Sequence, residues 1–480
     1  MKVLLVAVNG SYSHTNLAIR CLRTPLERAG FEVALLERNL RDRTAHILQD
    51  IVAQAADIVG FSVYIWNLPL MLELAETLKT VSPKTKIVVG GPEVSFETER
   101  FDAGVCPFID AVIAGEGEEA LPAVCIALRD GRPFDRVTVA SPARSVMGDE
   151  GILYRPDDYP AGSMLYYESS RGCPFHCAYC LSSASEGVRA KSVSQTEKDL
   201  LQFETLPQNV KIIKFVDRTF NYDPKRANAI WRLLLEERFT KRYHFEVCAN
   251  LLNEESFALL AQFPAGKVQL EFGLQSTNEE TLSAVSRHID AAQVLSSVDR
   301  IHRMGNIHVH LDLIAGLPYE TYDRFRQSFN QAYPACDLLQ LGFLKLLPGT
   351  SLRRDAEKYG IGYLHNPPYT VLSTNWLSYA ELVSLSRVDE VLERYREGGR
   401  FEQTLRVVFA HTVDYFGFYL GLSDWIAAHD GRRLQKISQP DAYRLLYAYA
   451  CTFIPDDDRE TLSRALHRDF AASEARELKL

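Results

Sequence analysis

The apolar positions of the first 140 residues alternate between short β-branched runs and longer segments with a helical period. The short runs predict strands at Val3–Val8, Glu32–Leu36, Asp57–Val63, Lys86–Val89 and Ala111–Ala114. The intervening segments predict helices near Asn16–Arg28, Ala45–Ala55, Leu68–Thr80 and Glu118–Leu128. Strands that alternate with helices form right-handed crossovers, so residues 1–140 are expected to fold as an α/β domain, a parallel sheet with helices on both faces.

A second alternation of this kind runs through residues 163–360. Its predicted strands are Leu165–Ser169, Lys211–Val216, His244–Cys248, Val268–Phe272, His308–Ile314 and Leu338–Lys345. Residues 141–162 contain Pro142, Pro156 and Pro160 and no sustained period, which predicts a linker. The apolar run Val137–Val146 at the start of this stretch could add an edge strand to the first sheet.

Residues 361–480 show helical periods and no strand pattern. The predicted helices lie near Tyr379–Tyr395, Gln403–Tyr419 and Ala442–Cys451. Their many aromatic residues stand at helical spacing, which is typical of a packed core. We therefore expect a mostly helical C-terminal domain.

Composition and charge narrow the class of protein. The 480 residues are 46% hydrophobic and 24% charged, as in a soluble globular protein, and the net charge of -9 argues against strong non-specific binding to nucleic acid. No apolar run approaches the ~20 residues that span a bilayer. Nine cysteines, an odd number with three of them clustered, do not resemble a disulfide framework, so a cytoplasmic location is expected.

The clustered cysteines are Cys173, Cys177 and Cys180, spaced C-x3-C-x2-C in a stretch that also carries Gly172 and Pro174. A loop of this composition can turn three sulfurs toward one metal centre. Three thiolates on a 4Fe–4S cube leave one iron without a protein ligand, as chemistry on a bound molecule requires. The alternative is a zinc site, which would need a fourth ligand.

This stretch resembles the signature of the radical S-adenosylmethionine (radical SAM) enzymes. The resemblance implies a 4Fe–4S cluster on the three cysteines, with S-adenosylmethionine on the open iron and Tyr179 beside its adenine. It also implies that residues 163–360 form the family's partial (βα)6 barrel, which resembles a TIM barrel opened on one side.

Polar residues at the ends of the predicted barrel strands extend the resemblance. Asp217 follows the second strand, and the fourth strand gives Glu271-Phe272-Gly273-Leu274-Gln275. In this order they resemble the coproporphyrinogen oxidases and methylthiotransferases of the family. That resemblance implies that Asp217, Glu271, Gln275 and Arg287 bind S-adenosylmethionine. The alternatives without a role in binding are that Asp217 stabilises a turn and that Arg287 is a solvated charge at the end of a helix.

The first domain carries its own distinctive residues where its strands end, and ligands of parallel sheets bind at that edge. The candidates are Ser11, His14, Ser62, Gly90, Gly91, Gly115 and Glu116. They resemble the Rossmann-like cobalamin-binding domain that precedes many radical SAM barrels. The fuller pattern of that domain has aspartate and glycine where this chain has Tyr12 and Leu17, so His14 either ligates cobalt or merely lines the pocket. A Rossmann-like domain that has lost this cofactor is the alternative.

These resemblances imply a cobalamin-dependent radical SAM enzyme that methylates an unactivated carbon through a 5′-deoxyadenosyl radical and methylcobalamin. Two alternatives remain open: a radical SAM enzyme without methyl transfer, performing rearrangement, ring closure or RNA-base modification, and a non-catalytic cobalamin- or redox-sensing protein. The expected partners are a small-molecule, peptide or RNA substrate and an external one-electron donor of the flavodoxin or ferredoxin type. In this family, C-terminal additions such as residues 361–480 recognise the substrate.

Overall fold

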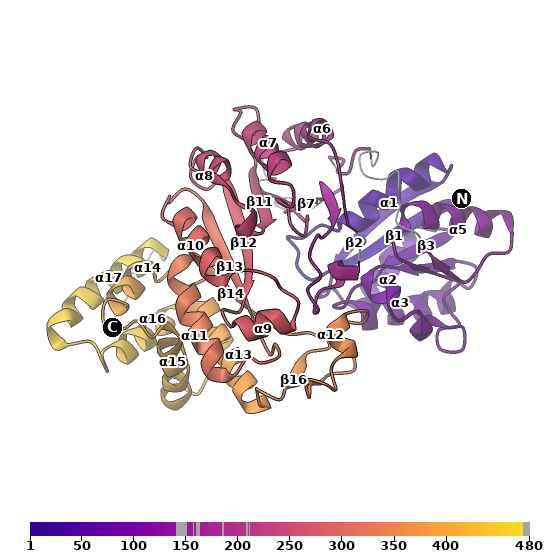
Figure 1. Ribbon diagram of the computed structural model, residues 1–480. Helices are drawn as coiled ribbons and strands as arrows, with labels where there is room; N and C mark the ends of the chain where they lie inside the picture. Colours follow the sequence, from indigo (N-terminus) through magenta and orange to yellow (C-terminus); the bar gives the residue numbers. More distant parts are fainter. Residues whose placement is uncertain are drawn as a thin grey trace. The chain divides into compact units, whose positions relative to one another are not determined.

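The computed structural model describes residues 1–140, 151–156, 158–159, 164–184, 187–207, 210 and 212–473 (Figure 1). The chain divides into two compact units. One comprises Met1–Leu270, Lys345–Arg354 and Leu364–Thr370, and the other comprises Glu271–Leu344, Asp355–Tyr363 and Val371–Leu480.

The N-terminal sheet is six-stranded and parallel, in the order β2-β1-β3-β4-β5-β6. Its strands are β1 (Lys2–Asn9), β2 (Glu32–Asn39), β3 (Ile58–Ser62), β4 (Lys86–Gly90), β5 (Ala111–Ala114) and β6 (Val137–Val139). The five strands expected within residues 1–140 are thus confirmed, and the expected edge strand is present as β6. The rest of that run, residues 141–146, lies outside the described residues.

Helices cover both faces of this sheet because the inner strands are apolar on both sides (Figure 1). Leu4 and Val6 of β1 pack toward α2 (Thr44–Ala53) and α3 (Leu68–Val81). The alternate residues Val3 and Leu5 pack in a separate cluster with side chains of α1 (Leu17–Arg28) and α5 (Gly117–Asp130). The alternation follows from the two-residue period of a strand.

Part of the predicted linker is held against α1 by two buried arginines. Arg23 donates to the carbonyl oxygens of Ile152 and Leu153 at 3.0 and 2.9 Å, and Arg20 donates to the carbonyl oxygen of Asp158 at 2.5 Å. These bonds satisfy irregular backbone that would otherwise need water. Of this linker, residues 141–150, 157 and 160–162 lie outside the described ranges.

The second large sheet has the order β14-β13-β12-β11-β10-β7. Its strands are β7 (Leu165–Tyr167), β10 (Ile212–Phe215), β11 (Arg242–Val247), β12 (Val268–Gln275), β13 (His308–Ala315) and β14 (Leu338–Phe343). The pairs β7–β10, β10–β11 and β13–β14 are parallel. All six predicted barrel strands are therefore present and in sequence order.

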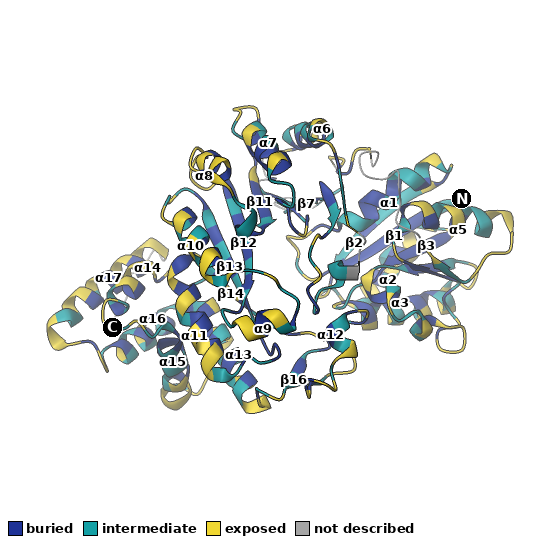
Figure 2. Cartoon of the chain, in the orientation of Figure 1, coloured by how far each residue is buried: buried dark blue, intermediate teal, exposed yellow. Residues whose placement is uncertain are grey.

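The helices of this region include α6 (Val193–Glu204), α7 (Pro224–Leu234), α8 (Glu254–Leu260), α9 (Glu279–Ala284), α10 (Ala291–His302) and α11 (Tyr322–Ala332). In Figure 2 the strands of this sheet alternate between dark blue, buried and teal, partly buried residues, whereas the helices carry yellow, exposed faces. This distribution is that of a sheet covered by amphipathic helices. Sequence patterns did not predict the short antiparallel pair β8 (Ser170–Gly172) and β9 (Val188–Ala190).

The C-terminal region is helical as expected, with one correction. Helix α13 spans Tyr379–Tyr395, as predicted, and α16 spans Gln439–Ala450. The single helix predicted at Gln403–Tyr419 is wrong, because the chain forms α14 (Glu402–Val408) and then α15 (Tyr415–His429). The break is made by Asp414, which caps the new helix by accepting a hydrogen bond from Gly417 N at 3.0 Å. Helix α17 (Arg459–Ser473) was not predicted.

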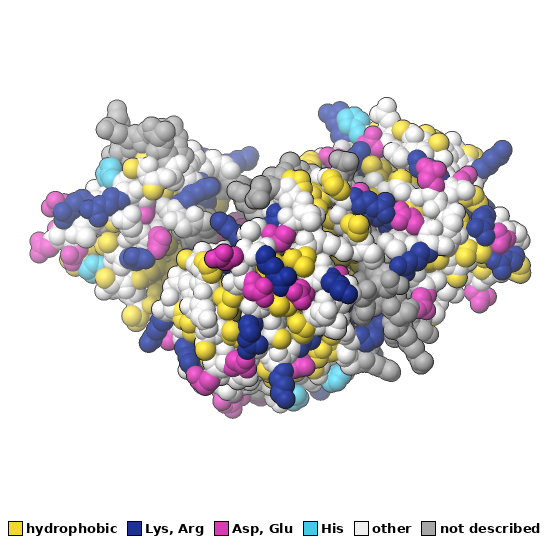
Figure 3. Space-filling model, turned by 90° about the horizontal axis from the view of Figure 1, so that it is seen from above, with side chains coloured by type: hydrophobic (Ala, Val, Ile, Leu, Met, Phe, Trp, Pro, Cys, Tyr) yellow, Lys and Arg dark blue, Asp and Glu magenta, His cyan; other side chains and the backbone are white. Residues whose placement is uncertain are grey.

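None of the helices in the described ranges combines the length and apolarity that crossing a bilayer requires. On the face drawn in Figure 3, cationic and anionic side chains of the described residues are interspersed.

Candidate functional site

The three cysteines stand in the loop that leaves β8 and ends in a short 3-10 turn, Leu181–Ala184. Gly172 begins the loop at φ 99°, a left-handed conformation that favours glycine. Cys173 and Cys177 are buried, with 9% and 6% of their surface exposed, and Cys180 is partly exposed. All three thiols are free of disulfides.

The thiol of Cys173 lies in an environment that resists ionisation. Burial raises its pKa, and the neighbouring thiols of Cys177 and Cys180 act in the same direction. A hydrogen bond with Thr219 Oγ1 at 3.5 Å opposes the shift. Three mutually interacting thiols in one loop form a donor set that fits a 4Fe–4S cluster, since binding to iron would remove their protons.

Asp217 holds the residues just before this loop in place by hydrogen bonds. The residue is fully buried, and its carboxylate accepts hydrogen bonds from Ser169 N at 2.7 Å, Ser169 Oγ at 2.5 Å and Ser170 Oγ at 2.7 Å. Arg226 donates to Ser169 Oγ at 2.9 Å. Burial raises the pKa of Asp217 although these hydrogen bonds oppose the shift. Asp217 was predicted to bind S-adenosylmethionine, and in this structure both of its oxygens hold the turn into β8.

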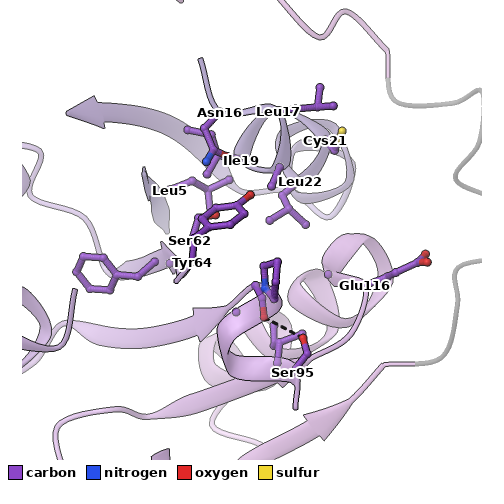
Figure 4. Close-up of a pocket in the computed structure, with 18 of the residues that line it drawn as sticks. Leu5, Asn16, Leu17, Ile19, Cys21, Leu22, Ser62, Tyr64, Ser95 and Glu116 are labelled. Atoms are coloured by element: carbon purple, nitrogen blue, oxygen red, sulfur yellow. Dashed lines mark hydrogen bonds between the residues drawn. The ribbon is translucent and has the colours of Figure 1, made fainter. Parts of the chain in front are cut away.

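A cavity of about 690 Å³ opens at the carboxyl ends of the N-terminal strands (Figure 4). This volume is in the range of cofactor and small-molecule sites. Its lining comes from two sources. The first sheet and its loops contribute Asn9, His14, Asn16, Ser62, Tyr64, Trp66, Gly90, Gly91, Ser95, Gly115 and Glu116, and the barrel side contributes Tyr166, Glu168, Arg171, Leu181, Ser182 and Arg218. Leu181 and Ser182 directly follow Cys180, so the cavity reaches the cysteine loop.

Two glycines that line the cavity are required by the packing of the protein itself, because a larger residue would collide with the neighbouring backbone. Gly91 has φ 121°, and a Cβ there would lie 2.4 Å from the carbonyl oxygen of Val63. Gly115 has φ 94°, and a Cβ would lie 2.9 Å from the carbonyl oxygen of Ala140. Ser95 Oγ, which donates to Gly91 O at 2.8 Å, closes this turn (Figure 4). The backbone consequently forms part of the cavity wall, a cradle that suits a large ligand.

Ser62 and His14 line this cavity, whereas Ser11 is not among its lining residues. The His14 imidazole is exposed and lies edge-on to the ring of Tyr166, with centroids 5.8 Å apart. Burial of part of the ring lowers the pKa of His14, and the charge of Lys214 lowers it further. A neutral imidazole has a free nitrogen lone pair, as a metal ligand needs.

Glu116 extends away from the other labelled side chains in Figure 4. Its carboxylate pairs with Arg171 at 3.1 Å and with Arg189. Arg171 also pairs with Glu118 at 2.8 Å and with Glu168 at 2.7 Å. These carboxylates outweigh the effect of burial and raise the pKa of the Arg171 guanidinium. Because Arg171 lies two residues before Cys173, this cluster of charges joins the cysteine hairpin to the loop after β5.

Glu271, Gln275 and Arg287, which were predicted to bind S-adenosylmethionine, belong to the second unit. Gln275 adopts φ 73°, and its amide and the Arg287 guanidinium converge over Gly273, whose carbonyl oxygen accepts a hydrogen bond from Arg287. Gln275 Oε1 is buried with no hydrogen-bond partner among the described residues. The carboxylate of Glu271 lies within 4.8 Å of the His310 imidazole. The structure thus brings Gln275 and Arg287 together and leaves a polar atom that fits a ligand such as S-adenosylmethionine.

Sequence reasoning missed Arg171, Trp66 and Arg218. A signal for Arg171 existed, because the acidic pair Glu116 and Glu118 needed a counter-charge and this arginine precedes the cysteine motif. Trp66 stacks on Tyr64 at a centroid distance of 4.4 Å, and its indole donates to the carbonyl oxygen of Val8 at 3.1 Å. Nothing in the local pattern distinguished Trp66 or Arg218 from ordinary loop residues. Tyr179 lies in the cysteine loop, partly buried and outside the cavity lining.

Three family models match different parts of the chain. Residues 3–125 match the B12 binding domain, and residues 167–332 match the radical SAM superfamily. Residues 357–478 match a family described as a protein of unknown function, DUF4080. The first two models imply cobalamin, a 4Fe–4S cluster and S-adenosylmethionine as cofactors.

Relatives match most of this chain in sequence. A protein of Pyrococcus horikoshii that is named an uncharacterized methyltransferase is 25% identical over 383 residues, which cover 74% of this chain and 79% of the relative. The hopanoid C-3 methylase of Methylococcus capsulatus is 25% identical over 426 residues, covering 83% and 80%. The cobalamin-dependent radical SAM methyltransferase TokK of Streptomyces tokunonensis is 23% identical over 421 residues, covering 77% of this chain and 61% of TokK.

Solved structures show the same fold. TsrM of Kitasatospora setae, with cobalamin and a [4Fe-4S] cluster bound, superposes with a TM-score of 0.65 at 17% identity, covering 88% of this chain and 97% of TsrM. The cobalamin-dependent S-adenosylmethionine radical enzyme OxsB superposes with a TM-score of 0.66 at 13% identity, covering 99% and 81%. The chain therefore combines a region that matches the B12 binding domain with a region that matches the radical SAM superfamily, and it has the fold of these solved structures.

Proposed function

We propose that this protein is a cobalamin-dependent radical SAM methyltransferase that acts on an unactivated carbon of its substrate. The observation that carries the proposal is the shared cavity. One wall comes from Gly90, Gly91 and Gly115 at the ends of the cobalamin-type sheet, and the other includes Leu181 and Ser182 beside the last cysteine. A methyl donor on the first wall and a radical generator near the second would both face one bound substrate.

The residues that would hold each group follow from the site. Cys173, Cys177 and Cys180 would hold the 4Fe–4S cluster, and Gln275 and Arg287, with Glu271 and Tyr179, would bind S-adenosylmethionine. Ser62 and the glycine loops would hold cobalamin, with His14 beside it. When bound, the cluster and S-adenosylmethionine supply a 5′-deoxyadenosyl radical, and cobalamin supplies a methyl group from a weak cobalt–carbon bond.

The chain's own share is placement and exclusion of water. Asp217 and Thr219 fix the cysteine loop through Ser169, Ser170 and the 3.5 Å contact to Cys173. Arg171 ties the same hairpin to the loop after β5. The aromatic side chains of Tyr64, Trp66 and Tyr166 line the cavity and make part of its wall apolar. Such a wall would limit the quenching of a radical by solvent.

The names of the relatives support methyl transfer. The M. capsulatus and S. tokunonensis proteins are named a methylase and a methyltransferase, and the P. horikoshii protein is named an uncharacterized methyltransferase. We carry this activity to the present chain as part of the proposal, together with a cytoplasmic location, an external electron donor of the flavodoxin or ferredoxin type, and substrate recognition by the C-terminal helical region.

The test uses anaerobically reconstituted protein loaded with cobalamin, reduced, and supplied with S-adenosylmethionine bearing a trideuterated methyl group. Small-molecule, peptide and RNA fractions of an extract of the native host serve as substrate sources. We expect 5′-deoxyadenosine together with an extract compound that gains the labelled methyl group, both measured by mass spectrometry. Formation of 5′-deoxyadenosine with no labelled product from small-molecule, peptide or RNA fractions would favour the alternative of a radical enzyme without methyl transfer.

Site variants sharpen the test. Cys173→Ala, Cys177→Ala and Cys180→Ala should each lose the visible absorption of the cluster and the formation of 5′-deoxyadenosine. Cys451→Ser is the matched control, since Cys451 is the partly exposed C-cap residue of α16, far from the cysteine loop in sequence, and its replacement should leave both signals unchanged. If an intact cluster formed no 5′-deoxyadenosine, the proposed activity would be wrong.

A further inference from the structure

Every carboxylate that lines the cavity has an arginine partner, whereas one of the two lining arginines has no carboxylate partner among the described residues. The carboxylates in its lining, those of Glu116, Glu118 and Glu168, all pair with Arg171, and Glu116 also pairs with Arg189. The second lining arginine, Arg218, has no side-chain hydrogen bond or ion pair within the described part of the chain. The cavity therefore contains one guanidinium that has no carboxylate partner among the described residues.

The position of Arg218 is set by its two neighbours. Asp217 is fully buried under the turn into β8, and Thr219 is buried with its hydroxyl 3.5 Å from the sulfur of Cys173. Both flanking side chains are thus engaged by the cysteine loop, while Arg218 is exposed and lines the cavity. A residue held between two such anchors presents its side chain from a rigid backbone, which favours a specific contact.

The side chain of Tyr64, which also lines the cavity, lies within electrostatic reach of the Arg218 guanidinium. Burial raises the pKa of Tyr64, and the charge of Arg218 is one of the influences that oppose this shift. Tyr64 in turn stacks on Trp66. The planar guanidinium of arginine can donate two parallel hydrogen bonds to the oxygens of a carboxylate or phosphate. Hydrogen bonds between charged groups are stronger than those between neutral groups. An apolar wall beside such a group suits a ligand that has an organic body and one anionic end.

We propose that Arg218 binds a carboxylate or phosphate oxyanion of the molecule that occupies this cavity. The proposal rests on the proposed function and extends it, because it specifies a chemical property of the ligand. Two sources of the oxyanion exist: the organic substrate, and the phosphodiester in the nucleotide loop of cobalamin. Cobinamide, which keeps the corrin ring and lacks that phosphodiester, distinguishes them.

The test measures how fast phenylglyoxal modifies Arg218 in the reconstituted full-length protein, with the modified peptide quantified by mass spectrometry. The protein is unloaded, loaded with cobinamide or loaded with cobalamin. Inorganic phosphate or citrate is added, and sodium chloride of matched ionic strength serves as the control. Arg232, an exposed arginine on α7 that pairs with Glu255, is the internal reference for general salt effects.

Two results would support the proposal. If the phosphodiester is the ligand, cobalamin slows modification on the order of tenfold or more while cobinamide does not, and Arg218→Gln weakens binding of cobalamin but not of cobinamide by a similar factor. If the substrate is the source, Arg218 stays reactive in the cobalamin-loaded protein, and phosphate or citrate slows its modification where chloride does not. Arg218→Lys should keep part of either effect, because the charge remains and the paired donor geometry is lost.

The opposite result is equally definite. If both corrinoids protect Arg218 equally and neither phosphate nor citrate has an effect beyond that on Arg232, the guanidinium binds no oxyanion and the inference is wrong. Binding of cobalamin and formation of 5′-deoxyadenosine are recorded in the same samples. Their loss in the wild type would contradict the proposed function, whereas their persistence with an unprotected Arg218 overturns only this inference.

Discussion

Replacement of Arg171 by leucine should destabilise the hairpin that carries the cysteines. The guanidinium is 20% exposed and pairs with Glu118, Glu168 and Glu116, of which Glu118 is 6% exposed. Arg171→Leu keeps apolar volume and removes the charge, leaving the three carboxylates close to one another. Removing one partner of a buried ion pair costs about 3–5 kcal/mol. Because the cluster keeps some contact with solvent, we expect about 3 kcal/mol at neutral pH.

The pH dependence is the sharper part of this prediction. Without Arg171, mutual repulsion would raise the folded-state pKa values of the carboxylates above the unfolded value of about 4.3 for glutamate. The penalty would then be full above the raised folded pKa and would vanish as the pH falls to the unfolded pKa. The loss should accordingly be greatest at about pH 7–8 and small at about pH 4.5.

Hydrogen exchange measured by mass spectrometry on peptides from β8, β9 and the start of α5 reports the local opening free energy at each pH. Arg155→Leu is the matched control, since Arg155 and its partner Glu27 are 46% and 33% exposed and such a pair contributes about 0–1 kcal/mol. Equal destabilisation by Arg171→Leu at both pH values would refute the electrostatic reasoning and indicate lost packing instead. Glu118→Gln in the Arg171→Leu background should recover part of the loss, because one of the repelling charges is gone.

Further predictions concern the cavity wall, the C-terminal helices and the loop after β4. Gly91→Ala should lower the free energy of unfolding by about 3 kcal/mol or more and reduce cobalamin binding, because the new Cβ would lie 2.4 Å from Val63 O and φ is 121°. Gly104→Ala is the control, since a Cβ there would meet nothing within 4 Å. Equal losses for the two variants in denaturant titrations would contradict the steric argument. Burial, with the charges of neighbouring glutamates, raises the pKa of Asp389 to about 7, so ionisation lowers stability as the pH rises from the unfolded pKa through this value. Asp389→Asn should therefore stabilise α13 by about 1–2 kcal/mol at about pH 8 and by little at about pH 4, as measured by thermal unfolding; the same gain at both would exclude the charge as the cause. Tyr369→Phe removes the hydroxyl that donates to buried Glu93 and accepts from Arg100 at 2.7 Å, and should cost about 1–3 kcal/mol in denaturant titrations, whereas a neutral result would mean that water replaces the hydroxyl.

Local pattern was sufficient for most secondary structure. The strand Ala111–Ala114 and the helix Tyr379–Tyr395 have the bounds that their periodicity predicts. The failures lie where a single polar side chain decides the outcome. Asp414 caps α15 and so divides what reads as one helix, since the aromatic period continues through the break. The β8–β9 pair was missed because each strand spans only three residues.

The site divides in the same way. The spacing of Cys173, Cys177 and Cys180 predicts a cluster from sequence alone, because all three ligands lie in one loop. The strand-end glycines likewise predict a binding edge, since parallel strands place their carboxyl ends together. What Asp217 does could not be inferred from its position, and its prediction as a cofactor ligand stays untested. In the fold its carboxylate accepts hydrogen bonds from Ser169 and Ser170, which are 48 and 47 residues away in the chain.

The sequence by itself determined the order of the strands and helices, the cysteine loop and the two kinds of domain, because each depends on residues that are neighbours in the chain. Only the tertiary structure decided which charges are neutralised. Arg171 forms ion pairs with Glu116 and Glu118 of the N-terminal sheet domain. Arg218 also lines the cavity and forms no ion pair with a carboxylate of the described residues. Ion pairing depends on separations of a few ångströms between residues far apart in sequence, and those separations exist only once the chain has folded.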